Sequence, residues 1–351
     1  MTYSPEDSPP LLTISIPTYN RADLLGEALD AILMQVNESN ASLVEVVISD
    51  NASPDKTADV VRTKSQTYAQ AQVTYNCQPA NIGAERNVLD VMAKGTGTYL
   101  LLLSDDDVLL PGGLDAILTR LRDHPGLNAL ALNMCGFAAS LADMEPPQYI
   151  LNSDRIIYAR GDALAFLGTA ITFISCLVVR RELIHGKDFS DSIGTFFPHS
   201  HAFLFALAHD GGMLITKDSV LATRGNTSLG YNFYEAFVTG FAKVMKYAES
   251  IGYPSEVTRA VLSKHSQWLA GWTTALVTRQ SLGGKHFSRL DAFRRLYAVY
   301  GADRYVLVRI IPVLLLPRSV AVVLSKAYRS VRRCCARSVP EEQPATKERE
   351  A

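Results

Sequence analysis

Between residues 11 and 103 the chain alternates short apolar runs with segments whose apolar residues recur at helical spacing. The apolar runs predict buried strands and the segments between them predict helices. Strands that alternate with helices typically form a parallel sheet covered on both faces, so the predicted fold class is α/β and Rossmann-like. The predicted strands are Leu11–Ile16, Val44–Ser49, Val73–Asn76 and Tyr99–Leu103, and the predicted helices are Asp23–Met34, Lys56–Tyr68 and Ala84–Ala93.

The pattern is weaker after residue 130. Apolar runs predict further strands at Ala129–Cys135, Thr172–Val179 and Ser219–Thr223, and a helix at Ser200–Ala208. The chain from Tyr231 to Tyr300 is predicted to be mainly helical.

Polar residues directly follow three of the predicted strands. They are Thr18–Arg21, Asp50–Asn51 and Ser104–Asp107. In a parallel sheet, ligands bind just beyond the carboxyl ends of the strands. The sequence therefore predicts that these three groups converge at one edge of the sheet.

Three consecutive carboxylates, Asp105–Asp107, follow the most apolar strand. They repel one another unless a cation or several hydrogen bonds compensate. Mg²⁺ prefers oxygen ligands and takes one or two carboxylates together with substrate phosphates. Such an ion would stabilise the charge that develops on a diphosphate leaving group. A solvated turn or a helix N-terminal cluster is the alternative interpretation.

Four segments with these features occur in order and together resemble a known family. They are Ile14–Arg21, Val47–Ser53, Asn81–Asn87 and Leu103–Asp107. The combination is similar to the inverting family 2 glycosyltransferases with the GT-A fold, and the Ser-Asp-Asp-Asp sequence is similar to the branch with abequosyltransferases and other O-antigen sugar transferases. The resemblance is strong over residues 11–125 and thin afterwards.

The resemblance implies a role for each matching position. The donor would be a nucleoside diphosphate sugar and the cofactor a divalent metal, Mn²⁺ or Mg²⁺. Asp106 would be the first metal ligand and Asp107 the second, in a motif of the DXD type. The expected donor-binding residues are Pro17, Thr18, Tyr19, Arg21, Asp50, Asn51, Arg86 and Asp105. For Asp50 a turn-forming role stays open, and for Arg86 a position on a helix surface.

An inverting displacement needs a general base for the acceptor hydroxyl. The family usually has a Glu-Asp pair about ninety residues after the DXD motif, and this chain has none there. His199 takes the place of the aspartate, and a histidine can act as a base near neutral pH. A structural or metal-binding role for His199 stays open, and Asp188 and Asp191 are the fallback bases.

Arg224 follows the predicted strand Ser219–Thr223. Its guanidinium would match the geometry of the departing diphosphate, so it is included among the donor-binding residues. An ordinary surface-loop arginine is the alternative.

The segment 305–324 is almost entirely apolar but contains Arg309, Pro312, Pro317 and Arg318. A spanning helix seldom carries so many interruptions. The basic residues that follow, from Lys326 to Arg337, favour peripheral contact with an anionic membrane, which would suit a lipid-linked acceptor. A buried pair of terminal helices is the alternative.

The charge, the cysteines and the N-terminal residues indicate the expected partners and location of the protein. The chain has 34 basic and 35 acidic residues, a net charge of −1, which argues against a nucleic-acid partner. Its five cysteines show no paired spacing that predicts a zinc site or a disulfide framework, and residues 1–10 lack the pattern of a secretory signal. The expected location is cytoplasmic, peripheral on the inner face of the cytoplasmic membrane.

The sequence thus predicts a glycosyltransferase of bacterial surface polysaccharide, such as lipopolysaccharide O-antigen, that acts on a glycan or lipid-linked oligosaccharide. A sugar nucleotidyltransferase or an inactive nucleotide-binding protein are the alternatives. The absence of a glycine-rich loop after the first strand argues against the former and against a dinucleotide oxidoreductase. The expected organisation is a disordered N-terminus (1–10), a catalytic domain (11–228, with a nucleotide-sugar half to about 125 and an acceptor half from about 126), a helical region (229–304), an amphipathic basic segment (305–337) and a disordered tail (338–351).

Overall fold

The computed structural model of the chain describes residues 9–138, 140–225, 231–278 and 287–324. These residues form two compact units. The first takes in the described part of Met1–Thr227 together with Glu235–His265, and the second the described part of Ser228–Tyr234 and Ser266–Ala351. The predicted disordered ends fall almost wholly outside the described residues.

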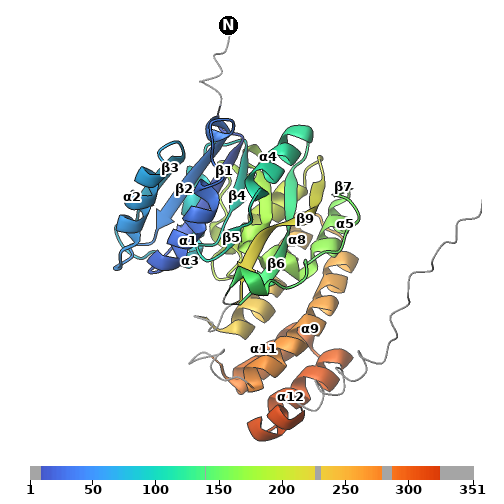
Figure 1. The fold of residues 1–351 in the computed structure, drawn as a ribbon. Helices are drawn as coiled ribbons and strands as arrows, with labels where there is room; N and C mark the ends of the chain where they lie inside the picture. Colours follow the sequence, from blue (N-terminus) through green and yellow to red (C-terminus); the bar gives the residue numbers. More distant parts are fainter. Residues whose placement is uncertain (1–8, 139, 226–230, 279–286, 325–351) are drawn as a thin grey trace, which may run out of the picture. The chain divides into compact units, whose positions relative to one another are not determined.

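A nine-stranded sheet forms the centre of the first unit, with strand order β3-β2-β1-β4-β8-β6-β9-β5, and β7 pairs with β9 (Figure 1). The first four of these strands are parallel, β8 runs antiparallel to both of its neighbours, and β6 and β9 are parallel. The sheet is therefore mixed, and the predicted parallel arrangement describes its first half. The strands are β1 (Leu12–Thr18), β2 (Val44–Asp50), β3 (Gln72–Cys77), β4 (Tyr99–Leu102), β5 (Val108–Leu109), β6 (Ala129–Phe137), β7 (Arg155–Ile157), β8 (Leu177–Arg180) and β9 (Met213–Arg224).

Helices of the first unit flank this sheet (Figure 1). α3 packs on β1 and β2, and α1 lies beside α2. The α-helices are α1 (Ala22–Leu33), α2 (Thr57–Thr67), α3 (Ala84–Lys94), α4 (Gly113–Asp123), α5 (Arg160–Leu167), α6 (Arg181–Ile184), α7 (Pro198–Leu207) and α8 (Phe241–Ser250), with a π-helical turn at Glu235–Gly240 and short 3-10 turns that include η4 (Gly168–Thr172) and η5 (Ile174–Cys176).

The second unit is helical in its described part. It contains the carboxyl-terminal portion of α9 (Ser255–Thr278), then α11 (Arg289–Tyr300), a π-helical turn at Val306–Ile310 and α12 (Ile311–Leu315). None of the helices within the described ranges combines the length and apolar character needed to cross a bilayer.

The position of the site follows from the order of the strands. The chain builds β1, β2 and β3 outward in one direction and then returns to place β4 on the other side of β1. At such a reversal the connections leave in opposite directions, and a crevice opens beyond the carboxyl ends of the two central strands. β1 and β4 are almost fully buried inside the sheet. Leu12, Ile14 and Leu101 are completely buried, and burial of each such side chain stabilises the fold by about 1.5–3 kcal/mol. The residues that follow these two strands are therefore held on a rigid base.

Two predictions for the second half of the first unit need correction. The region Thr172–Val179 is a strand only from Leu177 onward, because the preceding residues form the turns η4 and η5. The predicted strand Ser219–Thr223 is the end of a much longer strand, β9, which begins at Met213 and bends where its register with β6 shifts.

Candidate active site

The carboxyl ends of β1 and β4 meet at the acidic triplet Asp105–Asp107. The hydroxyl of Thr18, the last residue of β1, donates to Oδ2 of Asp105 over 2.7 Å. All three carboxylates are buried. The sequence prediction that polar residues after different strands converge at one edge is correct for these two strands.

Every carboxylate oxygen of the triplet accepts at least one hydrogen bond. The donors come from β1 and its following loop, from the triplet's own segment, from η5 and from the end of β9, so segments far apart in sequence meet here. They are Thr18 Oγ1 and Arg21 Nη1 on Asp105 (2.7 and 3.0 Å), Ser104 Oγ and Arg21 Nη1 on Asp106 (2.6 and 3.1 Å), and Ser175 Oγ and the backbone N–H of Arg224 on Asp107 (2.6 and 2.9 Å).

The three carboxylates differ in their electrostatic surroundings. Burial raises the pKa of Asp107 to about 7, and the neighbouring charge of Asp106 adds to the rise, while its hydrogen bonds from Ser175 and Arg224 oppose it. Burial also raises the pKa of Asp105, but Arg21 and Thr18 counteract the rise. With a pKa of about 7, Asp107 is therefore partly protonated near neutral pH.

Arg21 supplies a positive charge between two members of the triplet. Its Nη1 lies 3.0 Å from Oδ1 of Asp105 and 3.1 Å from Oδ2 of Asp106, and 43% of its side chain is exposed. Burial lowers the pKa of Arg21, but the carboxylates outweigh this effect and the net pKa is raised. A cation is thus already bracketed by two carboxylate oxygens at this point, on a side chain that reaches solvent.

The carboxylates of the triplet can be compared with the ligands that a divalent metal needs. Among the described residues no group of three or more His, Cys, Asp or Glu side chains is arranged to hold an ion. A Mg²⁺ or Mn²⁺ ion that shares a diphosphate needs only one or two protein carboxylates. The converging pair, Asp105 and Asp106, meets that requirement, whereas Asp107 is turned toward Ser175 and the Arg224 backbone.

At the end of β2, Asp50 and Asn51 lie close to the same crevice. Asp50 is buried, and its carboxylate accepts from Ser53 (backbone N–H at 2.9 Å and hydroxyl at 2.5 Å) and from the Tyr75 hydroxyl at 2.6 Å. Burial and the Asp50 charge raise the pKa of Tyr75. These contacts are those of a turn-forming aspartate, the alternative that the sequence left open. The Asn51 backbone N–H donates to the Thr18 carbonyl at 3.0 Å, which joins the ends of β1 and β2.

The other predicted donor-binding residues differ in their exposure. Tyr19 is exposed, Pro17 half-buried, and Arg86, in the first turn of α3, is exposed and has no hydrogen bond or ion pair with a described residue. Arg224 is oriented toward the triplet: its Nε donates to the Asp106 carbonyl at 3.2 Å and its guanidinium pairs with Glu27. The structure therefore brings Thr18, Arg21, Arg224 and the triplet together.

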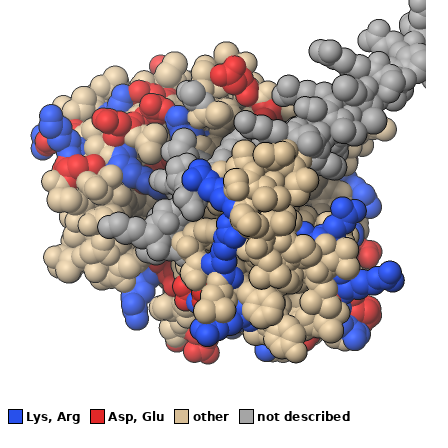
Figure 2. All heavy atoms as spheres, turned by 90° about the horizontal axis from the view of Figure 1, so that it is seen from below, with Lys and Arg blue, Asp and Glu red and all other residues tan. Residues whose placement is uncertain are grey.

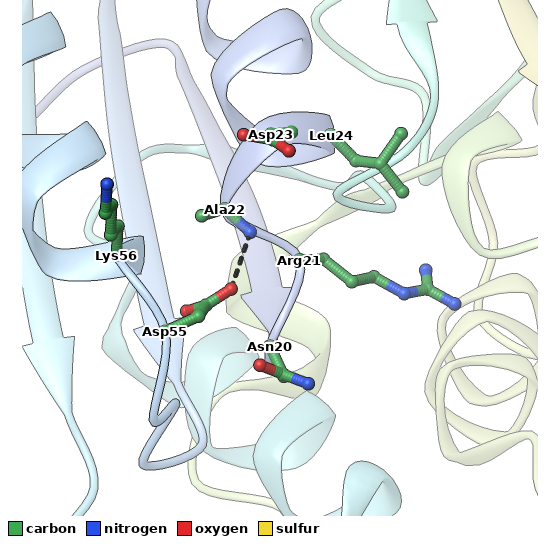
Figure 3. A pocket seen from close by; sticks show the side chains of 7 residues that line it. All are labelled: Asn20, Arg21, Ala22, Asp23, Leu24, Asp55 and Lys56. Atoms are coloured by element: carbon green, nitrogen blue, oxygen red, sulfur yellow. Dashed lines mark hydrogen bonds between the residues drawn. The ribbon is translucent and has the colours of Figure 1, made fainter.

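A cavity of about 510 Å³ lies beside this group, at the start of α1. Figure 3 shows that the Arg21 side chain points away from Asp55 and Lys56, while Asp55 accepts from the Ala22 backbone N–H at 3.0 Å. The cavity and the triplet therefore share Arg21 as their boundary. The lining residues are Asn20, Arg21, Ala22, Asp23, Leu24, Asp55 and Lys56.

His199 lies in the first turn of α7 and is buried. Its Nε2 is 3.1 Å from the Thr172 carbonyl, so Nε2 carries the proton and Nδ1 is unprotonated. Nδ1 has no hydrogen-bond partner among the described residues. Burial lowers the pKa of His199 to about 4, and the nearby His201 contributes to the decrease. The imidazole is therefore neutral at physiological pH.

The fallback bases lie in the segment before α7. Asp188 is exposed, and the Ser190 N–H at 2.8 Å lowers its pKa. Asp191 is exposed and has no hydrogen-bond partner in the part of the chain that the structure describes. Neither contacts the triplet, whereas His199 binds Thr172, three residues before Ser175.

Sequence reasoning missed two polar residues of the site. Ser175, which donates to Asp107, was hidden inside a predicted strand. Glu85 lies within the quoted segment Asn81–Asn87 but had no assigned role, and its carboxylate binds the loop before α7. A serine flanked by apolar residues carries no local signal, but an acidic residue beside Arg86 in a shared motif could have been singled out.

Known proteins resemble this chain in sequence. Residues 13–186 match the model of the family described as glycosyl transferase family 2. The abequosyltransferase RfbV of Salmonella typhimurium is 28% identical over 234 residues, which are 62% of this chain and 68% of that protein. A GalNAc(5)-diNAcBac-PP-undecaprenol beta-1,3-glucosyltransferase of Campylobacter jejuni is 30% identical over 113 residues, 32% of this chain and 34% of that protein.

The fold is also shared with a solved structure. A mannosyltransferase from Pyrobaculum calidifontis, in complex with GDP-Man and Mn²⁺, superposes with a TM-score of 0.53 at 18% identity and covers 92% of this chain and 89% of its own. At this level of identity the likeness shows the GT-A fold. The matched domain contains β1 from its second residue onward, β4 and the whole acidic triplet. Residues 13–186 of this chain therefore form a glycosyl transferase family 2 domain.

Proposed function

We propose that the protein transfers a sugar from a nucleoside diphosphate sugar to a glycan acceptor during synthesis of a bacterial surface polysaccharide of the O-antigen type. The observation that carries the proposal is the convergence of Asp105 and Asp106 on one cationic nitrogen, at the reversal point of the sheet. Two relatives whose names specify sugar transfer support it.

Asp106 is the proposed principal ligand of a divalent metal, Mn²⁺ or Mg²⁺, and Asp105 is its partner because both carboxylates already face the same cation. Asp107, the second ligand expected from the sequence, instead supports the triplet from the side of Ser175. When bound, the metal would neutralise charge on the diphosphate leaving group. The solved neighbour that binds Mn²⁺ supports the choice of metal.

The donor is proposed to lie along the ends of β1 and β2. The exposed ring of Tyr19, beside Pro17 and Thr18, offers a surface for the base, and Asp50 with Asn51 fixes the floor of the crevice. Arg86 is proposed to bind a phosphate of the donor. Its planar guanidinium can donate to two phosphate oxygens at once. Arg21 and Arg224 contact the triplet, and their positive charges are proposed to stabilise the negative charge of the diphosphate.

His199 is the proposed general base of an inverting displacement. Its unprotonated Nδ1 can accept a proton, and its turn is tied to the segment that carries Ser175. A pKa of about 4 makes it a weak base, and the negative charge of a bound diphosphate would raise that pKa. Asp188 and Asp191 stay as alternatives.

The acceptor is proposed to be lipid-linked, because the second unit has the composition of a surface that binds anionic membranes. Residues 289–337 contain eleven Lys or Arg against two Asp, a net charge of +9, while the rest of the chain has 23 basic against 33 acidic residues, −10. Basic residues near an anionic leaflet contribute about 1 kcal/mol each. The name of the Campylobacter relative specifies an undecaprenol diphosphate, which supports such an acceptor.

Large apolar side chains are exposed on the same unit. On α11 they recur at helical spacing and so share a face, with Tyr297 62% exposed. Figure 2 shows a face of the molecule on which Lys and Arg side chains lie between wide uncharged areas. A peripheral position on the inner face of the cytoplasmic membrane is consistent with this surface. The exposed apolar residues are Leu290, Phe293, Tyr297, Tyr305, Leu307, Val308, Leu315, Val320, Val323 and Leu324.

A thermal-shift screen tests the proposal. UDP, GDP, CDP and dTDP are each added to the full chain with and without Mn²⁺ or Mg²⁺. A ligand that binds only the folded state raises Tm by mass action. We expect one nucleotide to raise Tm in a metal-dependent way, and Asp106→Ala to remove the metal dependence while the fold persists. If no nucleotide changes Tm with either metal, the proposed function is wrong.

A further inference from the structure

The carboxylate of Glu85 binds three successive backbone N–H groups of a distant loop. Its Oε1 accepts from Gly194 (3.1 Å), Thr195 (3.1 Å) and Phe196 (2.6 Å), and its Oε2 accepts a second bond from Gly194 at 2.9 Å. Glu85 lies in the first turn of α3, about 110 residues earlier in the chain. The side chain therefore joins the donor half of the first unit to the loop before α7.

The backbone of this loop needs such a partner. Gly194 has a φ of +85° and Phe196 a φ of +69°, a left-handed conformation that a residue with a Cβ adopts at a cost of order 1 kcal/mol or more. This alternation turns successive N–H groups to one side and forms a concavity suited to a negative charge. Glu85 fills it, and Lys243 binds the Gly194 carbonyl at 3.1 Å. Glu85 and Lys243 therefore help to hold the loop in this conformation.

The loop leads directly into the helix that carries the candidate base. Phe197 precedes α7, and His199 lies in its first turn. His199 binds the Thr172 carbonyl, Ser200 Oγ donates to the Ile171 carbonyl at 2.8 Å, and the same short segment delivers Ser175 to Asp107. The position of α7 and that of the acidic triplet are thus set by one stretch of chain.

On its other side, Glu85 is connected to the end of β2. The residues just before α3 are fixed to Asn51, whose Oδ1 accepts from the Ile82 N–H at 2.8 Å and whose Nδ2 donates to Asn81 at 3.0 Å. Asn51 in turn binds the Thr18 carbonyl. A continuous series of contacts runs from Thr18 through Asn51, α3 and Glu85 to α7, and returns through Ser175 and the triplet to Thr18.

We infer that Glu85 is a positioning residue for glycosyl transfer: it holds the loop 194–196 so that the first turn of α7 stays in register with the acidic triplet. The inference rests on the proposed function. An acidic residue in the first turn of a helix can also simply complement the helix dipole, but that role needs no contact with another segment, and the Glu85 carboxylate is directed at the loop.

The test compares Glu85→Gln, Glu85→Ala and the control Glu182→Gln, a change at an exposed glutamate that pairs with Arg180. For each full-length variant we would measure Tm, the Kd of whichever of UDP, GDP, CDP and dTDP binds the wild type, and kcat and donor KM from release of that nucleotide from its sugar ester. The amide of Gln keeps one acceptor oxygen but turns an NH₂ group toward N–H donors, so it preserves shape and removes part of the binding.

We expect kcat to fall about tenfold in Glu85→Gln and about 100-fold in Glu85→Ala, because a misplacement of about 1 Å costs that much, while donor KM and nucleotide Kd stay within about twofold. Unchanged kcat in Glu85→Gln would overturn the inference. A parallel loss of nucleotide affinity and kcat would also overturn it, since it would show a general structural role. If the wild type binds none of the four nucleotides, it is the proposed function that fails, and the role of Glu85 fails with it.

Discussion

The hydroxyl of Thr18 donates a 2.7 Å hydrogen bond to Oδ2 of Asp105, which joins the last residue of β1 to the first carboxylate after β4. This contact spans the point where the order of the strands reverses. It leaves the opposite oxygen of Asp105 facing Arg21 and, through Arg21, Asp106. One oxygen of this carboxylate is thus fixed by a neutral donor, while the other faces the positive charge of Arg21.

Arg21 is expected to compete with a divalent cation for Asp105 and Asp106. Without nucleotide, Arg21→Gln should bind Mn²⁺ about tenfold more tightly than the wild type, a difference of about 1.4 kcal/mol. Titration of free Mn²⁺ followed by electron paramagnetic resonance measures this directly. Arg62→Gln, which removes an exposed arginine paired with Asp59, is the matched control and should leave the affinity unchanged. Equal or weaker Mn²⁺ binding in Arg21→Gln would show that the guanidinium does not occupy the cation position.

Asp107 should make stability depend on pH in a direction opposite to that of most aspartates. Its pKa is raised to about 7 in the folded protein, against about 4 in an unfolded chain, so between these values the folded state holds a proton that the unfolded state has released. The contribution of Asp107 to stability is therefore full below about pH 4 and is lost as the pH rises toward 7. Asp107→Asn cannot ionise and should avoid this loss.

Thermal melts in EDTA at pH 5 and pH 8 measure the effect. The Tm difference between Asp107→Asn and the wild type, variant minus wild type, should be several degrees larger at pH 8 than at pH 5. Asp59→Asn, at an exposed surface pair, should show no such change. A difference that stays constant with pH would mean that Asp107 titrates normally.

His199→Ala should lower kcat by about 100-fold or more, because loss of a general base typically costs 10²–10⁴. Nucleotide affinity should stay the same, since His199 contacts Thr172 and no predicted donor-binding residue. His201→Ala provides a comparison on the same helix, where a buried imidazole binds the Phe197 carbonyl. If turnover is retained in His199→Ala, the base lies elsewhere, and Asp188→Asn and Asp191→Asn are the next variants.

The apolar face of α11 should contribute to membrane binding. We expect Phe293→Asp with Tyr297→Asp to reduce cosedimentation with vesicles that contain phosphatidylglycerol by at least tenfold, because each buried apolar side chain contributes about 1.5–3 kcal/mol. Binding of the wild type should also weaken with salt, since screening reduces the attraction of basic residues. Met34→Asp, at the exposed methionine that directly follows α1, is the control. Equal binding to vesicles of phosphatidylcholine alone would contradict an electrostatic contribution.

The first half of the fold was predictable because each element had its own local signal. Strands such as Val44–Asp50 have a run of apolar residues at their centre, and helices such as Ala84–Lys94 end at glycine. Every predicted element up to residue 103 is confirmed within two residues at its ends. The rule that ligands bind beyond the carboxyl ends of parallel strands then placed Thr18 and the triplet together.

The second half was less predictable because its structure depends on long-range contacts. The turns η4 and η5 place Ser175 on Asp107, although the local sequence has the composition of a strand. The antiparallel pairing of β8 with β4 and β6 likewise has no local signal, since an apolar strand carries no information about its direction. Family resemblance was thin in this region, so it could not replace that information.

The roles of individual side chains were predictable only where a motif contained them. Asp106 and Arg21 lie in such motifs, and the structure places them in contact. The position of His199 at the start of a helix was predictable, but the burial that lowers its pKa to about 4 was not. The residues Lys326 to Arg337, which carry much of the expected membrane charge, lie outside the described residues.

The hydrogen bonds that Asp107 accepts from Ser175 and from the backbone of Arg224 have a consequence for engineering. A chimaera that joins the first 125 residues of this chain to the remainder of a homologue would inherit three crowded carboxylates and would depend on the homologue for both donors to Asp107. Exchange of acceptor preference by domain grafting should therefore retain the serine at 175 and the backbone path around 224. Grafts made without them would be expected to misfold locally at the crossover, whatever the quality of their substrate pockets.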